Sequence, residues 1–73
     1  MTLPIEPLFV AYGRPWREFR TIVGARHTVL TRYKIQGMPV DVADLYAVKC
    51  GLHPVEVWGI DTWLEAIKEK INE

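Results

Sequence analysis

Apolar residues between Trp16 and Gln36 recur at steps of three and four, the spacing that places side chains on one face of an α-helix. The pattern predicts two short helices, one over about residues 15–23 and one over about residues 26–35, joined by a tight turn at Gly24. The residues spaced to close a small core between these two helices are Phe19, Val23, Ala25, Leu30 and Tyr33.

Further helices are expected on both sides of this pair. The first can start at Pro4 or Pro7, because proline is tolerated in a first helical turn. Residues 40–49, 52–58 and 61–72 follow, with Asp41 in the first turn of one helix and Asp61 or Thr62 as the cap of the last. No segment alternates like a strand. The sequence predicts an all-α fold, a compact bundle of about five short helices, with residues 1–73 as a single domain and residues 61–73 as its C-terminal helix.

Each of these helices is expected to turn its apolar side toward the core. The predicted inward residues are Leu8, Phe9, Tyr12, Val42, Leu45, Tyr46 and Val48. The last helix carries an apolar stripe of Trp63, Leu64, Ile67 and Ile71. This stripe has two uses open to it: it can complete the core of the monomer, or it can pair two monomers as a homodimer.

Length and composition narrow the class of protein. A single domain of 73 residues has a small core worth roughly 3–5 kcal/mol, so a partner can add stability. No apolar run approaches the length of a membrane span, and the first dozen residues lack the basic start and long apolar segment of a signal peptide. The single cysteine, Cys50, excludes an internal disulfide and fits a reducing cytoplasm.

The net charge is zero, but the charges are unevenly distributed. Residues 14–34 hold six basic side chains against one acidic side chain, Glu18, a balance of +5. The rest of the chain holds three lysines against eight acidic residues, a balance of −5. Like charges confined to one segment produce a one-sided field that attracts a polyanion. The alternative is a charged face that only binds water.

Two helices joined at a glycine, the second of them basic on its outside, are typical of a helix-turn-helix whose second helix enters the major groove of DNA. Arg26 can bond a guanine or a phosphate, and His27 is expected near a phosphate. Thr28, Val29 and Thr31 can bond a phosphate or touch a thymine methyl group. The predicted DNA-binding residues are Arg14, Arg17, Arg26, His27, Thr28, Thr31, Arg32 and Lys34.

The order of these elements resembles the helix-turn-helix regulators of the phage repressor and Cro type. The residues that carry the resemblance are Phe19, Val23-Gly24-Ala25, Leu30-Thr31-Arg32-Tyr33, Gly37 and Pro39, followed by residues 42–51 as the next helix. Residues 51–58 are similar to a segment in small regulators of actinobacterial phages. The resemblance covers residues 15–58, and it implies sequence-specific binding of double-stranded DNA and regulation of transcription on the nucleoid of a bacterial host cell.

Two positions differ from the family pattern. Arg20 stands where the family has a small residue, and its long stem can lie along the surface with the guanidinium outside. Ala25 and Arg26 stand where the family has a capping Ser, Thr or Asn, so the start of the recognition helix can shift toward Thr28. Arg20 and the zero net charge leave open a protein-interaction module on the same scaffold. A third alternative is a recombination directionality factor, which often carries a two-stranded wing, but no strand signal follows the predicted recognition helix here.

Other chemistry has little support in the sequence. The soft ligands are Cys50, His27 and His53, and they lack the spacing of a zinc site. A nucleophilic Cys50 would need a pocket that so short a chain can barely enclose, so a buried structural cysteine is the prediction. The glycines are too widely spaced for a phosphate-binding loop. We therefore expect no metal, no cofactor and no enzymatic activity.

Overall fold

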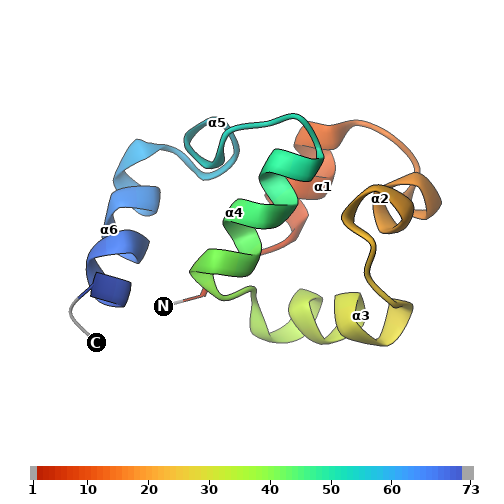
Figure 1. The fold of residues 1–73 in the computed structure, drawn as a ribbon, viewed down its shortest axis with the longest axis horizontal. Helices are drawn as coiled ribbons and strands as arrows, with labels where there is room; N and C mark the ends of the chain where they lie inside the picture. Colours follow the sequence, from red (N-terminus) through yellow and green to blue (C-terminus); the bar gives the residue numbers. More distant parts are fainter. Residues whose placement is uncertain (1, 72–73) are drawn as a thin grey trace.

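The computed structural model describes residues 2–71, and the side chains of residues 2–69. Within this range the chain forms six helices and no extended strand, which confirms the predicted all-α fold (Figure 1). The helices are α1 (Glu6–Tyr12), α2 (Trp16–Val23), α3 (His27–Gln36), α4 (Val40–Lys49), α5 (Pro54–Trp58) and α6 (Ile60–Ile71).

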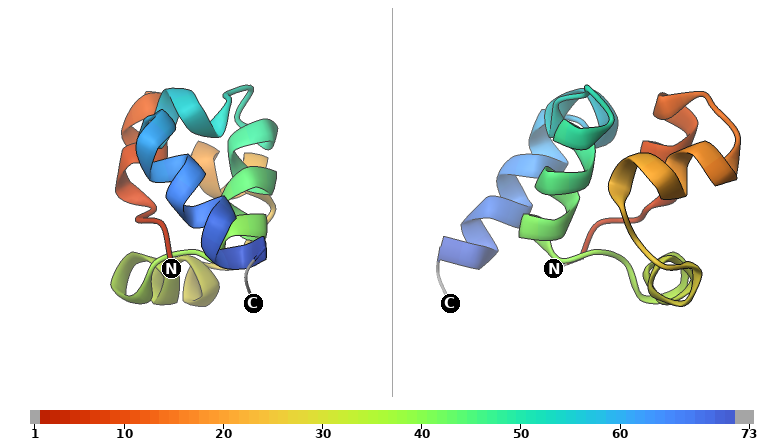
Figure 2. Two further views of the ribbon diagram at one scale, coloured as in Figure 1. Left: turned by 90° about the vertical axis from the view of Figure 1, so that its left-hand side faces the viewer. Right: turned by 45° about the vertical axis from the view of Figure 1, so that its right-hand side comes forward.

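The helices are arranged around α1, α4 and α5. Helix α6 lies against α4 and α5 at one end of the molecule, and α2 lies against α1 and α4 at the other (Figures 1 and 2). Helix α3 runs along one edge, the lower edge in Figure 1, where it crosses below the others. The second helix of the predicted pair is therefore the most peripheral helix of the fold.

One core joins all of these elements, and α5 contributes the fully buried Pro54 and several partly buried side chains to it. The other fully buried apolar residues come from the N-terminal segment, from α1 to α4 and from α6: Leu3, Ile5, Leu8, Phe19, Val23, Leu30, Met38, Ala43, Tyr46, Ala47, Trp63 and Ala66. The predicted core between α2 and α3 is present, with Ala25 and Tyr33 at its margin. Five ring contacts link the aromatic residues of α1, α2, α3 and α4 around it, and a sixth stacks Trp58 on Trp63.

The N-terminal segment pairs with the end of α3, a contact that the sequence did not predict. Leu3 N–H donates to Met38 O (2.8 Å), and Met38 N–H donates to Leu3 O (2.7 Å), so two residues form an isolated antiparallel bridge. Gly37 precedes this bridge with φ of 83°, and a Cβ atom there would lie 2.6 Å from Thr2 Oγ1. Only glycine therefore fits where the two segments approach.

The inward face of α4 differs from the prediction. Leu45 and Val48 are exposed, and the helix packs through Ala43, Tyr46 and Ala47. Apolar residues occur all around α4, so periodicity does not define its face. Ala43 and Ala47 determine which face of α4 is buried, because small side chains let a helix approach its neighbours closely.

Helix α6 starts one residue earlier than expected and buries its tryptophan. Trp63 N–H donates to Gly59 O (3.0 Å), so helical bonding begins at Gly59, before Asp61 or Thr62. Trp63 is 8% exposed and belongs to the monomer core, whereas Leu64 is 47% exposed. The predicted position of Ile71 in the stripe lies outside the described side chains.

Substitution of Leu30 tests how α3 is held. Leu30 is 0% exposed, and truncating a buried leucine costs about 2–5 kcal/mol, so we expect Leu30→Ala to unfold much of this small domain. Ile35→Ala is the matched control on the same helix, because Ile35 is 80% exposed and its loss should change the free energy of unfolding by about 0.5 kcal/mol or less. Thermal denaturation followed by circular dichroism measures both, and equal melting temperatures for the two variants would contradict the assignment.

Candidate nucleic-acid interface

Helices α2 and α3 form a helix-turn-helix with a short connection of three residues, 24–26. Gly24 makes the turn with φ of 70°, and its N–H donates to Arg20 O (3.0 Å) at the end of α2. Lys49 Nζ of α4 donates to Val23 O (3.2 Å), which neutralises a free carbonyl at this helix end and fixes the turn against the rest of the fold.

The outer face of α3 is built from four side chains. Successive residues of an α-helix are rotated by about 100°, so positions 28, 31, 32 and 35 fall on one side. All four are exposed: Thr28, Thr31, Arg32 and Ile35. The opposite side holds Leu30 and the half-buried Tyr33, which contacts the Tyr46 ring edge-on. The face turned to solvent therefore offers hydroxyl, guanidinium and methyl groups and no carboxylate.

The start of α3 is also exposed, and it lacks a side-chain cap. Arg26 is the residue before the first helical turn, with extended backbone, and His27 is the first helical residue, so the helix begins one residue later than predicted. No side chain accepts from the first amides. Thr31 Oγ1 donates to His27 O (2.9 Å), which leaves the threonine oxygen only as an acceptor but keeps its methyl group available.

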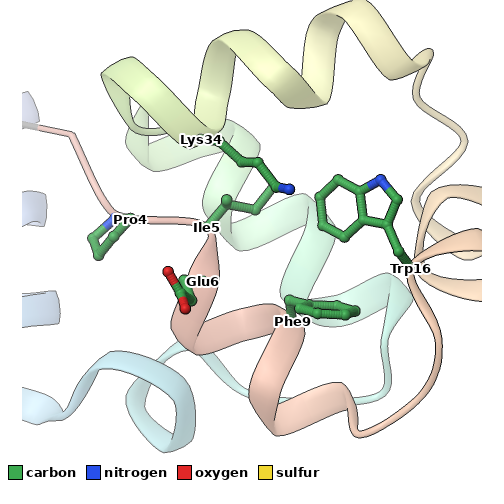
Figure 3. A pocket seen from close by; sticks show the side chains of 6 residues that line it. All are labelled: Pro4, Ile5, Glu6, Phe9, Trp16 and Lys34. Atoms are coloured by element: carbon green, nitrogen blue, oxygen red, sulfur yellow. The ribbon is translucent and has the colours of Figure 1, made fainter.

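Lys34 lies away from the outer face of α3. Its Nζ lies 4.1 Å from the centre of the Trp16 ring, a cation–π contact between α3 and the start of α2. Both side chains line a hollow of about 310 Å³ beside α1, with Phe9 and Glu6 opposite (Figure 3). The phosphate contact predicted for Lys34 would therefore lie beside the start of α2 and not on the outer face of α3.

The other basic residues predicted to bind DNA differ in their exposure and in the groups that their charges contact. Arg14 forms an ion pair with Glu18 (3.6 Å), so part of its charge is compensated. Arg17 and Arg26 are exposed, and Arg32 lies beside the Tyr33 ring at 5.7 Å. Of the residues predicted to bind DNA, the structure brings Arg26, His27, Thr28, Thr31 and Arg32 together on α3 and at its start, and places Arg14, Arg17 and Lys34 around α2.

Two residues that the sequence analysis did not select belong to this region. Ile35 projects from the outer face, and the four-residue step from Thr31 could have indicated it. Arg20 is half-buried and lines a hollow together with Gly24 and Ala25, and this position could be known only from the packing.

Basic and acidic residues occupy different segments of the sequence, and these segments form different helices of the fold. The basic residues of 14–34 lie on α2, on α3 and in the segments directly before them, whereas the acidic residues of 41–69 lie on α4, α5 and α6, of which α6 is at the opposite end of the molecule from α2 (Figure 1). A neutral domain thus has one basic end, which attracts a polyanion to α2 and α3.

Comparisons of the chain with protein families, with curated proteins and with solved structures find no match. Within the described residues there is no cluster of His, Cys, Asp and Glu that could hold a metal ion, and no helix is long and apolar enough to cross a membrane. His53 Nδ1 accepts from Val55 N–H (3.1 Å), so this ring nitrogen caps α5.

Two side chains at or beside the core, Tyr46 and Cys50, have raised pKa values. Burial raises the pKa of the Tyr46 phenol, and the neighbouring Tyr33 raises it further. Burial also raises the pKa of the Cys50 thiol. A nucleophilic cysteine needs the opposite change, because the thiolate is the reactive form. Cys50 is half-buried against the core, as a structural cysteine would be.

Alkylation of Cys50 by iodoacetamide tests this assignment. Because burial raises the pKa of the thiol, the native chain holds less thiolate at mildly alkaline pH than the unfolded chain does. We expect labelling to be several-fold slower in the native state, with the difference narrowing as pH rises. Mass spectrometry with and without denaturant measures both rates, and faster labelling of the native chain would indicate an activated nucleophile.

Proposed function

We propose that this protein binds double-stranded DNA sequence-specifically through α3 and regulates transcription as a small helix-turn-helix regulator. The observation that carries the proposal is the placement of α3 at the edge of the fold, with a polar, basic and methyl-bearing face that no described element covers. The major groove is about 12 Å wide and admits one α-helix. Ten residues of α3 span about 15 Å, enough to follow a few base pairs.

Each side chain of this face has a role suited to its chemistry. Arg26 stands at the start of α3 and reads a guanine through two hydrogen bonds. Thr28, Thr31 and Ile35 present methyl groups along one stripe, which suits the methyl groups of thymines. Arg32 and His27, at the sides of the stripe, suit phosphates. The order along α3 is therefore a polar contact first and apolar contacts after it.

Contacts to the DNA backbone come from α2 and the residues before it. Arg17 and Arg14 precede or start α2, and Lys34 lies beside Trp16 at the same helix end. Phosphate contacts position a protein on the duplex without reading sequence. The protein then acts on the nucleoid of the bacterial cell, as the resemblance to phage regulators implies.

Selection from a random duplex library, followed by sequencing of the retained pool, tests the proposal. We expect an enriched motif of a few base pairs for each copy of α3. We also expect affinity to fall steeply with salt, because each neutralised phosphate contributes a log–log slope of about −0.9. A pool without a motif and a flat salt response would contradict DNA binding and favour a protein partner for the same face.

The Arg26→Ala variant tests the reading of a base. We expect a loss of about 1–3 kcal/mol on the selected motif and a relaxed preference at one base position. Arg32→Ala is the matched comparison, because it removes the same charge from the side of the helix and should weaken all duplexes equally. Fluorescence anisotropy with the motif and with single-base variants measures both, and a uniform loss for Arg26→Ala would reassign it to the backbone.

We also propose that two copies bind together through the exposed side of α6. One α3 reads few base pairs, and helix-turn-helix proteins pair on two half-sites. Because Trp63 is buried, the residues free for pairing in the described part of α6 are Ile60 and Leu64, with Ile67 partly buried beside them.

Leu64→Asp tests the pairing, with Trp63→Ala as the comparison. In a paired protein, Leu64→Asp should shift sedimentation to monomer and weaken binding to a two-half-site duplex while the helical content is kept. Trp63→Ala should lower the helical content itself, because it empties the core. A wild-type chain that sediments as a monomer both free and on DNA would contradict the pairing.

A further inference from the structure

The hollow beside α1 brings together two opposite charges that do not pair with each other. It is formed by the N-terminal segment, α1, the start of α2 and α3, and the residues that line it are Pro4, Ile5, Glu6, Phe9, Trp16 and Lys34 (Figure 3). Lys34 Nζ lies against the Trp16 ring, and within the described residues the Glu6 carboxylate has no ion-pair or hydrogen-bond partner. The hollow therefore offers one cation and one anion, each able to bind a charged group of another molecule.

The apolar residues of this hollow are less exposed than the two charged ones. Ile5 is 2% exposed, and Phe9 and Trp16 are half-buried with their rings edge to face, 5.0 Å apart between centres. Glu6 and Lys34 are exposed. A ligand of matching character has an apolar part directed inward and a charged part at the rim. The volume of about 310 Å³ is near the lower limit of ligand sites, which restricts the ligand to a small molecule.

The two opposite charges of the hollow select the charged part of the ligand. A ligand with only a carboxylate is attracted to Lys34 and repelled by Glu6, and a ligand with only an ammonium meets the reverse arrangement. A molecule that carries both groups on one carbon can form a charge-assisted hydrogen bond with each of the two residues. The apolar side chain of such a molecule can contact Ile5, Phe9 and Trp16. The hollow thus suits a zwitterion with an apolar side chain.

We propose that this hollow binds a free α-amino acid with an apolar side chain, its carboxylate on Lys34 Nζ and its ammonium on the Glu6 carboxylate. The inference goes beyond the proposed function, because binding of the amino acid requires no DNA. Lys34 is also among the residues proposed to contact a phosphate of the duplex, so the amino acid and the duplex would compete for one ammonium. By linkage, each ligand would then weaken the binding of the other.

L-Phenylalanine and two analogues that each lack one charge test the proposal: phenylpropionate has only the carboxylate, and phenethylamine has only the ammonium. Titration of the intact protein is followed by NMR at the indole N–H of Trp16. We expect L-phenylalanine, with about a dozen non-hydrogen atoms, to bind with a Kd on the order of 1 mM. Each analogue should bind about fivefold more weakly, the upper value for one exposed ion pair. Equal affinities for the three compounds, or no shift with either L-phenylalanine or L-leucine at about 10 mM, would overturn the proposal.

The Glu6→Gln variant separates recognition of the zwitterion from a general affinity for apolar compounds. It removes the negative charge of the hollow and keeps the size of the side chain, and Glu65→Gln, at an exposed position of α6, is the matched control. We expect Glu6→Gln to lose about fivefold in affinity for L-phenylalanine and none for phenylpropionate, whereas Glu65→Gln should change neither. A Glu6→Gln protein that binds L-phenylalanine as the wild type does would overturn the amino-acid site and leave the proposed DNA binding intact. A wild-type chain that binds L-phenylalanine as expected but no duplex would support the site and overturn only the DNA binding.

Discussion

The position of α3 depends on the pairing of Leu3 with Met38. This two-residue bridge buries both side chains and satisfies the backbone amides and carbonyls of both residues, which a buried segment must do. It forces the chain to leave α3 at Gly37, beside Thr2, and to turn at once into α4. Thr2 Oγ1 adds a bond to Gln36 O (3.0 Å), the last residue of α3. The C-terminal end of α3 is thereby fastened to the start of the chain.

The other end of α3 is fastened through α2. Gly24 reverses the chain, Lys49 caps the last turn of α2, and Leu30 reaches the core from the middle of α3. A helix held at its two ends and by one buried side chain can leave most of its surface exposed. The edge position of α3 thus follows from these few contacts, and the role proposed for α3 in reading DNA needs that position.

The helices were predictable from the sequence because proline and glycine mark their ends. Pro39 stands before α4 and Gly24 after α2, and the structure matches these predicted bounds within a residue. Helix α5 starts at Pro54, two residues after the predicted start at residue 52. The buried face of a helix was predictable only where apolar and polar residues lie on opposite sides of that helix, as in α2. In α4 they do not separate, so Leu45 and Val48 were placed inward wrongly.

The parts of the site that sequence reasoning missed depend on distant contacts. The bridge of Leu3 joins residues 35 positions apart, and no local pattern indicates such a pair. The basic character of Lys34 suggested a phosphate contact, but its place against Trp16 depends on how α3 crosses α2. The resemblance marked Arg20 as a departure, and only packing shows that its Nε is buried with no hydrogen-bond partner in the described part of the chain.

Because few contacts hold α3 in place, binding of a ligand to α3 would change the stability of the fold. Because the core is small and α3 contributes one fully buried side chain to it, the free energy that holds α3 in place is a modest share of an already small total. A ligand that binds only the folded chain adds RT ln(1 + [L]/Kd), about 2.7 kcal/mol at a hundredfold excess over Kd. A duplex bound as proposed would contact both α3, which buries one side chain fully, and α2, which buries two. It would thereby connect the more weakly packed helix to the better-packed one. The surface proposed for recognition is therefore also one whose occupation by a partner would stabilise the helix that packs least.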